Sequence, residues 1–163
     1  MSNTIQTEPD LQKILFCTDF SKNADLAFEF AVGAATRHVG SVLYLLHVIP
    51  EPEAQFWKTY VYEVDDVDRK AKRDIDEKIE QAYRARIPDN ITLIIEVRIG
   101  RDASEIIDFA EEHEIDLIIM GRQGNSQFGK FLFGSVTEKV TRKANCPILV
   151  VPDSARHRLT EKD

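Results

Sequence analysis

The chain has 163 residues, of which 43% are hydrophobic and 30% charged, and this composition is typical of one soluble globular domain. Its net charge of -7 argues against a general nucleic-acid binder, because such proteins need a basic face. The polar segment 1–12 lacks the hydrophobic core of a signal peptide, and the apolar runs are too short to span a bilayer. We therefore expect a cytoplasmic protein that neither binds nucleic acid nor inserts into a membrane.

Both cysteines, Cys17 and Cys146, lie inside apolar runs. Free cysteine is among the most buried residue types, and disulfides are rare in a reducing compartment. We interpret both as small core residues and expect neither a disulfide nor a metal site.

Strand and helix patterns alternate from the start of the chain. The apolar run 13–18 predicts a strand, and residues 21–39 have apolar side chains at spacings of three and four, which predicts a helix with Ser21 as its N-cap. The run 41–49 predicts a second strand. The segment 51–62 contains two prolines and has no clear period, so we interpret it as a loop.

The alternation continues through the middle of the chain. Residues 63–87 predict a charged helix with one buried stripe, and residues 91–99 predict a third strand. Asp102 is expected to cap the next helix with Glu105 as its capping-box partner. The run 115–120 predicts a fourth strand.

The last third begins with a glycine-containing loop, 121–133. A helix is expected over 134–143, opening with a capping box of Ser135 and Glu138, and the fifth strand is expected over 147–151. Strands that are apolar on both faces and alternate with helices form a parallel sheet covered on both sides. We predict an α/β fold: an open, doubly wound, five-stranded parallel sheet of Rossmann-like type with strand order 3-2-1-4-5. The domain spans 13–152, between a polar N-terminal extension, 1–12, and a polar C-terminal tail, 153–163.

Ligands of open α/β sheets bind beyond the carboxyl ends of the strands, where the glycines of this chain gather. Gly121 and Gly124 allow a sharp turn, including positive φ, and a close approach to a ligand. Gly134 and Ser135 would supply free N–H groups at the positive end of a helix dipole, which favours phosphate. The alternative is that the glycines only make turns and Ser135 only caps its helix, and spacing alone leaves both interpretations open.

Two other phosphate motifs fit poorly. Residues 124–130 match GxxxxGK, but Phe131 stands where a P-loop has the serine or threonine that holds Mg²⁺. The segment also follows the fourth strand, and the helix does not begin directly at Lys130. A GxGxxG sequence is missing after the first strand, which disfavours a dinucleotide site of the Rossmann type.

The ordered motifs resemble those of the ATP-binding universal stress proteins. Gly121-x-x-Gly124, nine residues and Gly134-Ser135 match the family pattern G-x2-G-x9-G-[S/T]. The segments 18–21, 46–49 and 146–152 also look like the family, and the resemblance runs from about Lys13 to Pro152.

The resemblance implies an ATP site whose divalent metal, Mg or Mn, is held by the phosphates and not by the protein. The family commonly has proline or an aliphatic residue where Cys17 stands, so a thiol at this ligand-facing position could be oxidisable, although a packed core cysteine is the simpler interpretation. The implied nucleotide-binding residues are Cys17, Thr18 and Asp19 at the adenosine end, Val48 at the adenine through its backbone, Met120 and Gly121 beside the ribose and phosphates, Arg122 as a loop cation, and Gly124, Gly134, Ser135 and Val136 at the phosphates.

Three functions remain in competition: a nucleotide-dependent regulatory module, a slow ATPase or phosphotransferase, and a partner-binding module for which ATP is incidental. A complete glycine pattern would be unnecessary without a phosphate ligand, which disfavours the third. Efficient phosphoryl transfer needs a group that positions the nucleophile, and the loop offers the cations Arg122 and Lys130 but no evident base. His47 has no assignable partner, so we assign no catalytic residue and favour regulation of an unidentified protein partner.

The last strand, Cys146–Val151, is expected at an edge of the sheet because the sheet winds outward to it. A bare apolar edge promotes aggregation unless it is paired or covered. A two-fold homodimer through this strand is the simplest closed solution, and the family resemblance points the same way. The alternative is a monomer whose polar tail folds back over the edge.

Overall fold

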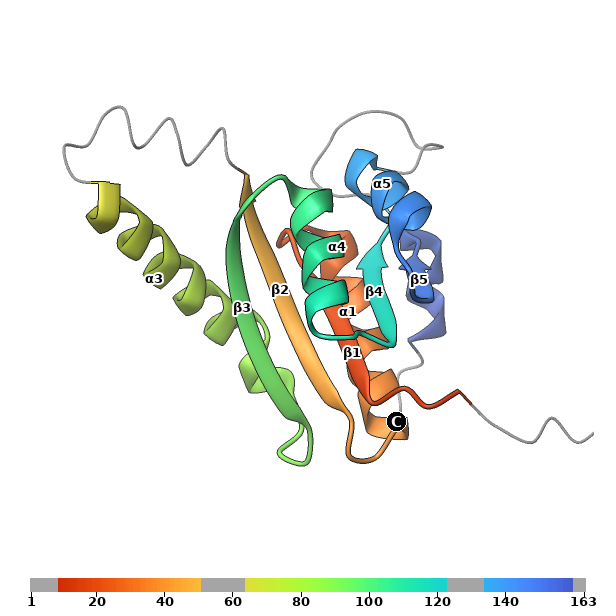
Figure 1. Ribbon diagram of the computed structural model, residues 1–163. Helices are drawn as coiled ribbons and strands as arrows, with labels where there is room; N and C mark the ends of the chain where they lie inside the picture. The colour runs from red at the N-terminus through yellow and green to blue at the C-terminus, as the bar shows by residue number, and fades with distance from the viewer. Residues whose placement is uncertain (1–8, 51–63, 123–133, 160–163) are drawn as a thin grey trace, which may run out of the picture.

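The computed structural model describes residues 9–50, 64–122 and 134–159. In this part of the chain a five-stranded sheet has the order β3-β2-β1-β4-β5, and every neighbouring pair is parallel (Figure 1). The predicted fold class and strand order are therefore confirmed. The strands are β1 (Lys13–Cys17), β2 (Val42–Pro50), β3 (Thr92–Gly100), β4 (Leu117–Gly121) and β5 (Ile148–Val151); the α-helices are α1 (Lys22–Arg37), α3 (Val64–Ala82), α4 (Asp102–Glu112) and α5 (Ser135–Lys143); and two 3-10 helices are η1 (Arg84–Arg86) and η2 (Asp153–Arg158).

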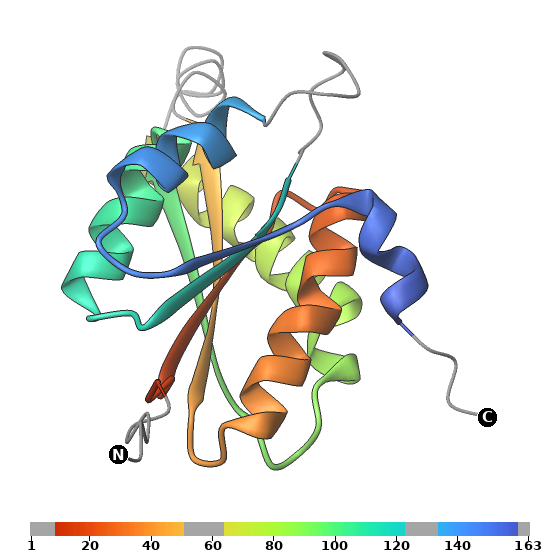
Figure 2. The same cartoon turned by 90° about the vertical axis from the view of Figure 1, so that its right-hand side faces the viewer.

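Helices cover both faces of the sheet, with α4 and α5 on one side and α1 on the other (Figure 2). The core on the α1 side also includes Ile79 of α3 and Tyr83, which follows it. Three rings fill this layer, and the ring of Phe28 lies 4.8 Å from that of Tyr83 and 5.5 Å from that of Phe16, measured between centroids. Large side chains therefore pack this face tightly.

The opposite face has its own core beneath α4 and α5. Ile106 and Phe109 of α4 are buried there against Leu15 and Leu46 of the sheet. Alternation along β1 produces both cores, because Ile14 and Phe16 point to one face and Leu15 and Cys17 to the other.

The charged helix predicted over 63–87 ends earlier, at Ala82, and η1 follows it. Tyr83 is buried at the break, and Arg86 places its guanidinium 4.6 Å from the centroid of the Phe28 ring. Arg86 also forms ion pairs with two acidic side chains of α1, Asp25 and Glu29. We attribute the early end to these contacts with α1, which hold the chain after Ala82 in a tighter turn.

One predicted helix cap is confirmed and two are wrong. The Ser21 hydroxyl accepts the Ala24 N–H at 3.2 Å, as expected of the N-cap of α1. The N-cap positions of α4 and α5 belong to Arg101 and Gly134, and neither has a side-chain cap hydrogen bond. Asp102 and Ser135 are instead the first helical residues, because each helix begins one residue earlier than a cap at these positions would require.

The C-terminal tail was expected to be only a polar extension, but residues 153–158 form η2, which packs beside α1 (Figure 2). Ala155 of η2 contacts the core on that face. Strand β5 lies at the edge of the sheet and faces the viewer in Figure 2, and Leu149 in it is 39% exposed. The described residues of the tail therefore pack on the helical layer and leave this strand edge open.

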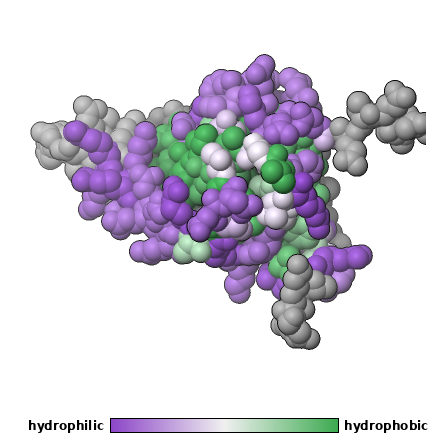
Figure 3. Space-filling model, turned by 90° about the horizontal axis from the view of Figure 1, so that it is seen from below, coloured by the Kyte–Doolittle hydropathy of each residue, from purple (hydrophilic) through white to green (hydrophobic). Residues whose placement is uncertain are grey.

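The end of the sheet where the strands begin carries apolar surface among charged side chains (Figure 3). Val39, in the turn before β2, is 88% exposed, and Ile94 on β3 is 42% exposed. None of the helices in residues 9–50, 64–122 and 134–159 combines the length and apolarity needed to cross a membrane.

Candidate functional site

A cleft of about 370 Å³ opens at the carboxyl ends of β1, β2 and β4, which is the upper end of the molecule in Figure 1. The beginnings of α1, α4 and α5 form the rest of its wall. Its position agrees with the general site of ligand binding in open α/β sheets. The lining residues are Cys17, Thr18, Asp19, Ser21, Ala24, Leu46, Val48, Pro50, Asp102, Ile106, Met120, Gly121, Gly134, Ser135, Val136 and Thr137.

The end of β1 is fixed by hydrogen bonds on every side of Thr18. Its N–H donates to the Leu46 carbonyl at 3.0 Å, and its hydroxyl oxygen accepts the Phe20 N–H at 3.0 Å. The next residue, Asp19, accepts the Ser21 N–H on its carboxylate at 2.9 Å. The carboxylate therefore lies in the cleft wall on a turn held by its own backbone.

Apolar side chains form another part of the wall. Leu46 and Val48 come from β2, Ile106 comes from α4 and Met120 from β4. Cys17 at the end of β1 is buried with them, and this burial raises the pKa of its thiol far above the ordinary value. Because the thiolate is the reactive form of cysteine, the protonated thiol acts here as an apolar side chain. This part of the cleft suits a flat ring with apolar faces, such as a nucleobase.

The beginning of α5 is held against the end of β4 by two hydrogen bonds. The Gly134 N–H donates to the Arg122 carbonyl at 3.0 Å, and the buried Thr137 hydroxyl donates to the Gly121 carbonyl at 3.0 Å. Gly134 therefore does not offer a free N–H, contrary to the expectation from sequence. The following N–H groups in the first turn, from Ser135 on, lie at the positive end of the helix and suit an anion.

Gly121 has a structural reason of its own. A Cβ placed on it would lie 2.9 Å from the backbone carbonyl carbon of Asn23, so a side chain here would push α1 away from β4. Positive φ is not the reason, because Gly40 is the glycine for which a positive φ is found in the described residues. Gly121 thus allows the close approach of α1 that forms one wall of the cleft.

The universal stress protein family model matches residues 11–152. The chain belongs to this family. The universal stress protein MJ0577 of Methanocaldococcus jannaschii is 30% identical over 154 residues, covering 86% of this chain and 94% of the relative. The solved structure of MJ0577 has a TM-score of 0.76 at 31% identity, covering 88% of this chain and 96% of that chain.

Two more distant members have been solved with nucleotides. A universal stress protein in complex with cAMP has a TM-score of 0.54 at 22% identity, covering 88% of this chain and 98% of its own. An Arabidopsis thaliana member with AMP bound has a TM-score of 0.50 at 14% identity, covering 93% of this chain and 97% of its own. At these identities the likeness concerns the fold alone.

In this universal stress protein most of the residues predicted for the site line the same cleft, although their contact with a nucleotide stays a prediction. Arg122 does not line the cleft, and its backbone instead connects the end of β4 to β5 and to the beginning of α5. Its N–H donates to the Val151 carbonyl at 2.9 Å, and its carbonyl receives the Gly134 N–H. Gly124 and the GxxxxGK segment with Lys130 lie outside the described residues.

Part of the cleft wall was not predicted from the sequence. Asp102 and Ile106 line the cleft because α4 follows the end of β3, and the polar residues around Gly100 could have signalled this strand end. Thr137 was recognisable as a polar β-branched residue one turn after Gly134. The other missed lining residues are Ser21, Ala24, Leu46 and Pro50.

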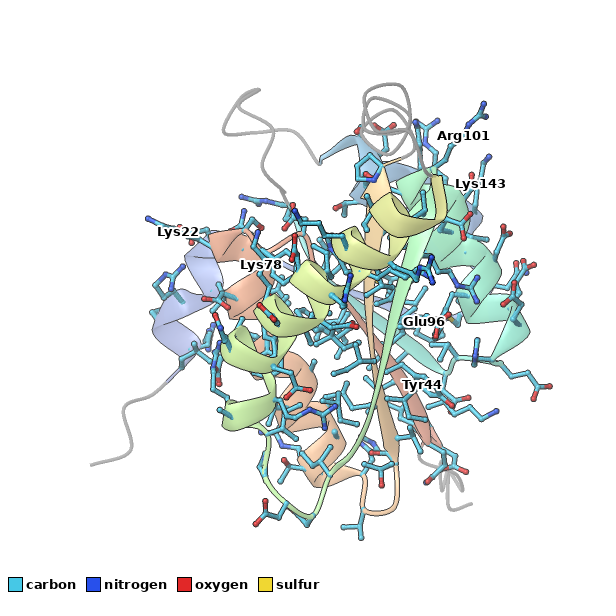
Figure 4. The ribbon with its side chains drawn as sticks, turned by 90° about the vertical axis from the view of Figure 1, so that its left-hand side faces the viewer. Lys22, Tyr44, Lys78, Glu96, Arg101 and Lys143 are labelled. Atoms are coloured by element: carbon cyan, nitrogen blue, oxygen red, sulfur yellow. The ribbon has the colours of Figure 1, made fainter. Side chains whose placement is uncertain are left out.

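The charges around the cleft are mixed. Asp19 and Asp102 line it, while Figure 4 shows Lys22, Lys78 and Arg101 toward the same end of the molecule. Lysines and arginines here would offset the charge of phosphates although the chain carries a net charge of -7. The described residues contain no group of three or more His, Cys, Asp or Glu that could hold a metal ion.

Proposed function

We propose that this universal stress protein binds ATP in the cleft and acts in the cytoplasm as a nucleotide-dependent regulatory module for a protein partner. The observation that carries the proposal is the convergence of three features on one cleft. Val48 and Ile106 supply an apolar wall, Asp19 supplies a fixed carboxylate, and the beginning of α5 supplies N–H groups for an anion. The nucleotides held by the cAMP-bound and AMP-bound relatives support a nucleotide as the ligand.

The cleft suits adenosine phosphates in size and in the chemistry of its walls. Its volume of about 370 Å³ is in the range of small-molecule sites. The base would lie against Val48 and Pro50, and the phosphates would lie by Gly121 and the Ser135 hydroxyl. A Mg or Mn ion would be held by the phosphates, where it would neutralise their charge.

Regulation is favoured over turnover by the hydrogen bonding of the Asp19 carboxylate. A slow ATPase or phosphotransferase, the alternative, needs a group that positions water or another nucleophile at the terminal phosphate. Asp19 already accepts the Ser21 N–H, which favours a role in holding the site over one as a base. If bound ATP releases inorganic phosphate as fast as ATP itself dissociates from the protein, the enzyme would be supported instead.

Equilibrium binding tests the proposal. The chain should bind ATP more tightly than GTP, because fixed backbone groups near Val48 would read the adenine; equal affinities would remove adenine recognition from the proposal. Gly134→Val should abolish binding with the fold intact, since its Cβ would occupy space at the phosphates. Lys130→Ala should reduce binding only modestly, whereas a true P-loop would lose most of it.

We also propose a two-fold dimer through residues 146–151. The exposed edge of β5, with Leu149 39% exposed, supports it, and isologous pairing is the commonest oligomer symmetry. Hydrogen bonds from β4 reach the carbonyls of Pro147 and Val151, so the intervening Val150 N–H faces the free edge. Val150→Pro removes that donor and should convert the dimer to a monomer in light scattering. A wild-type chain that is monomeric at micromolar concentration would contradict the dimer but not the nucleotide site.

A further inference from the structure

Phe20 has a backbone conformation that residues other than glycine rarely adopt. Its φ is 62°, in the left-handed region, which is unfavourable for a residue with a bulky side chain. It stands between Asp19 and Ser21, and both of these neighbours line the cleft. The conformation of Phe20 therefore decides where the Asp19 carboxylate and the Ser21 N-cap point.

Three side chains surround the Phe20 ring. Its centroid lies 4.7 Å from that of His47 and 6.1 Å from that of Tyr83, with which it is stacked. The Lys78 ammonium lies 5.3 Å from the same centroid, and Figure 4 shows Lys78 on the part of α3 nearest the beginning of α1. Because Lys78 and Tyr83 belong to the end of α3 and the residue after it, this region packs directly on the strained turn.

A second connection runs through hydrogen bonds. The Tyr83 hydroxyl lies 2.6 Å from that of Thr18, whose oxygen also accepts the Phe20 N–H. The Thr18 carbonyl accepts from His47 Nδ1 at 2.8 Å, which requires the proton on that nitrogen. Burial raises the pKa of Tyr83 to about 12, so its hydroxyl stays protonated at neutral pH. The turn at Phe20 is thus held by the hydrogen bonds of Thr18 and by the packing of the Phe20 ring against His47 and Tyr83.

We propose that Phe20 is a positioning residue through which occupancy of the cleft and packing of the end of α3 are coupled. The inference rests on the proposed function, because it names the part of the molecule that responds to the nucleotide. A ligand that contacts Asp19 favours the left-handed turn, and this turn places the Phe20 ring against His47, Lys78 and Tyr83. By linkage, α3 packed in this way favours the ligand to the same degree.

A purely structural role would give a different result. If the Phe20 ring only filled space, its removal would lower the stability of the fold and leave the affinity of folded protein for ATP unchanged. If it holds the turn, its removal lowers the affinity even under conditions where the chain is fully folded. The two roles therefore differ in a binding measurement.

The chain offers a matched control at the other end of the sheet. Glu114, directly after α4 and its C-cap, is the second residue besides glycine with positive φ in the described part of the chain, at 52°. It is exposed and does not line the nucleotide cleft. Glu114→Gly relieves the same kind of backbone strain and also removes an exposed ion pair with Lys13 at 3.6 Å, which contributes little, so it should change stability only slightly and leave ATP affinity unchanged.

The test compares ATP affinity among four chains under folding conditions. We expect Phe20→Ala to bind about tenfold more weakly than wild type, because alanine keeps the unfavourable φ but loses the ring contacts. Phe20→Gly should lie between the two, since glycine adopts positive φ freely but does not fix it. Glu114→Gly should bind like wild type. Equal affinity of Phe20→Ala and wild type would overturn the inference.

Hydrogen exchange tests the coupling itself. ATP should slow exchange of the amides over residues 75–83 in wild type, and saturating ATP should not do so in Phe20→Ala. The same protection in both chains would overturn the coupling while leaving the nucleotide site intact; a wild-type chain that binds no ATP overturns the proposed function as well. If Phe20→Ala does not fold, Tyr83→Phe removes only the hydroxyl bound to Thr18, and unchanged affinity there would likewise overturn the inference.

Discussion

The face of the sheet under α1 and α3 is filled by large rings, whereas the face under α4 and α5 leaves a cleft at one end. Phe16, Phe28 and Tyr83 are all at most 1% exposed on the first face. On the second, Cys17 and Ala103 are among the small side chains near the cleft end. The same alternating strands support both faces, and Phe109 fills the second face away from the cleft. The volume of the side chains at the cleft end therefore decides which face can admit a ligand there.

Phe28→Ala should give the largest effect on stability, because solvent does not reach the aromatic layer and the substitution would leave an empty cavity there. We expect the free energy of unfolding to fall by about 3–5 kcal/mol, measured by urea denaturation. Part of the loss would come from the Arg86 guanidinium that lies over this ring. A loss below about 1 kcal/mol would mean that this face is not tightly packed.

Ile106→Ala makes the complementary change in the cleft wall. Its stability loss should stay near the lower end for such a substitution, about 2 kcal/mol, because the new space opens into the cleft and can hydrate. Its main effect should be weaker ATP binding, measured by calorimetry and compared with the binding of ATP by Phe28→Ala. If Ile106→Ala costs as much stability as Phe28→Ala, the two faces do not differ in the way described.

Thr137→Val should cost less again. The substitution keeps the shape of the side chain but removes the hydroxyl that donates to the Gly121 carbonyl at 3.0 Å. We expect a loss of about 1 kcal/mol in the free energy of unfolding, with weaker ATP binding because α5 is no longer fixed at β4. Thr141→Val, which alters a bond within α5, is the control and should leave ATP binding unchanged.

The smallest effect is expected from the protonation of His47, which changes stability with pH. The His47 ring packs on the Phe20 ring near the cleft. Burial lowers its pKa below the ordinary 6.5, although the Thr18 carbonyl and the charges of Asp19 and Asp102 act in the opposite direction. Between the folded pKa and 6.5 the unfolded chain therefore binds more protons, and stability falls as the pH is lowered through this window. His47→Gln should flatten that part of the stability profile. A wild-type profile that rises as the pH falls would contradict the sign.

The sheet could be predicted from sequence because its strands are apolar on both faces and each is separated from the next by a helix pattern. The end of α3 could not, because Tyr83 and Arg86 leave the helix for contacts with Phe28 and other residues of α1 that are distant in the chain. Local periodicity carries no information about such partners. The strand order, once known, explains these contacts.

The candidate site was predictable where glycine and polar residues mark the ends of β1 and β4. The sequence around Asp102 predicts only a helix cap, because it is the folded sheet that brings the beginning of α4 beside β1 and β2. The turn at Phe20 was hidden for the opposite reason. Local preference argues against positive φ at phenylalanine, and the rings that favour it come from β2 and the end of α3.

The bond from the Gly134 N–H to the Arg122 carbonyl has a consequence for how the family can diverge. It joins the end of β4 directly to the beginning of α5, so these two elements hold each other in place. Substitutions between Arg122 and Gly134 that keep the spacing of the glycine pattern should therefore leave β4 and α5 where they are. Recognition can then change at this position on an unchanged scaffold.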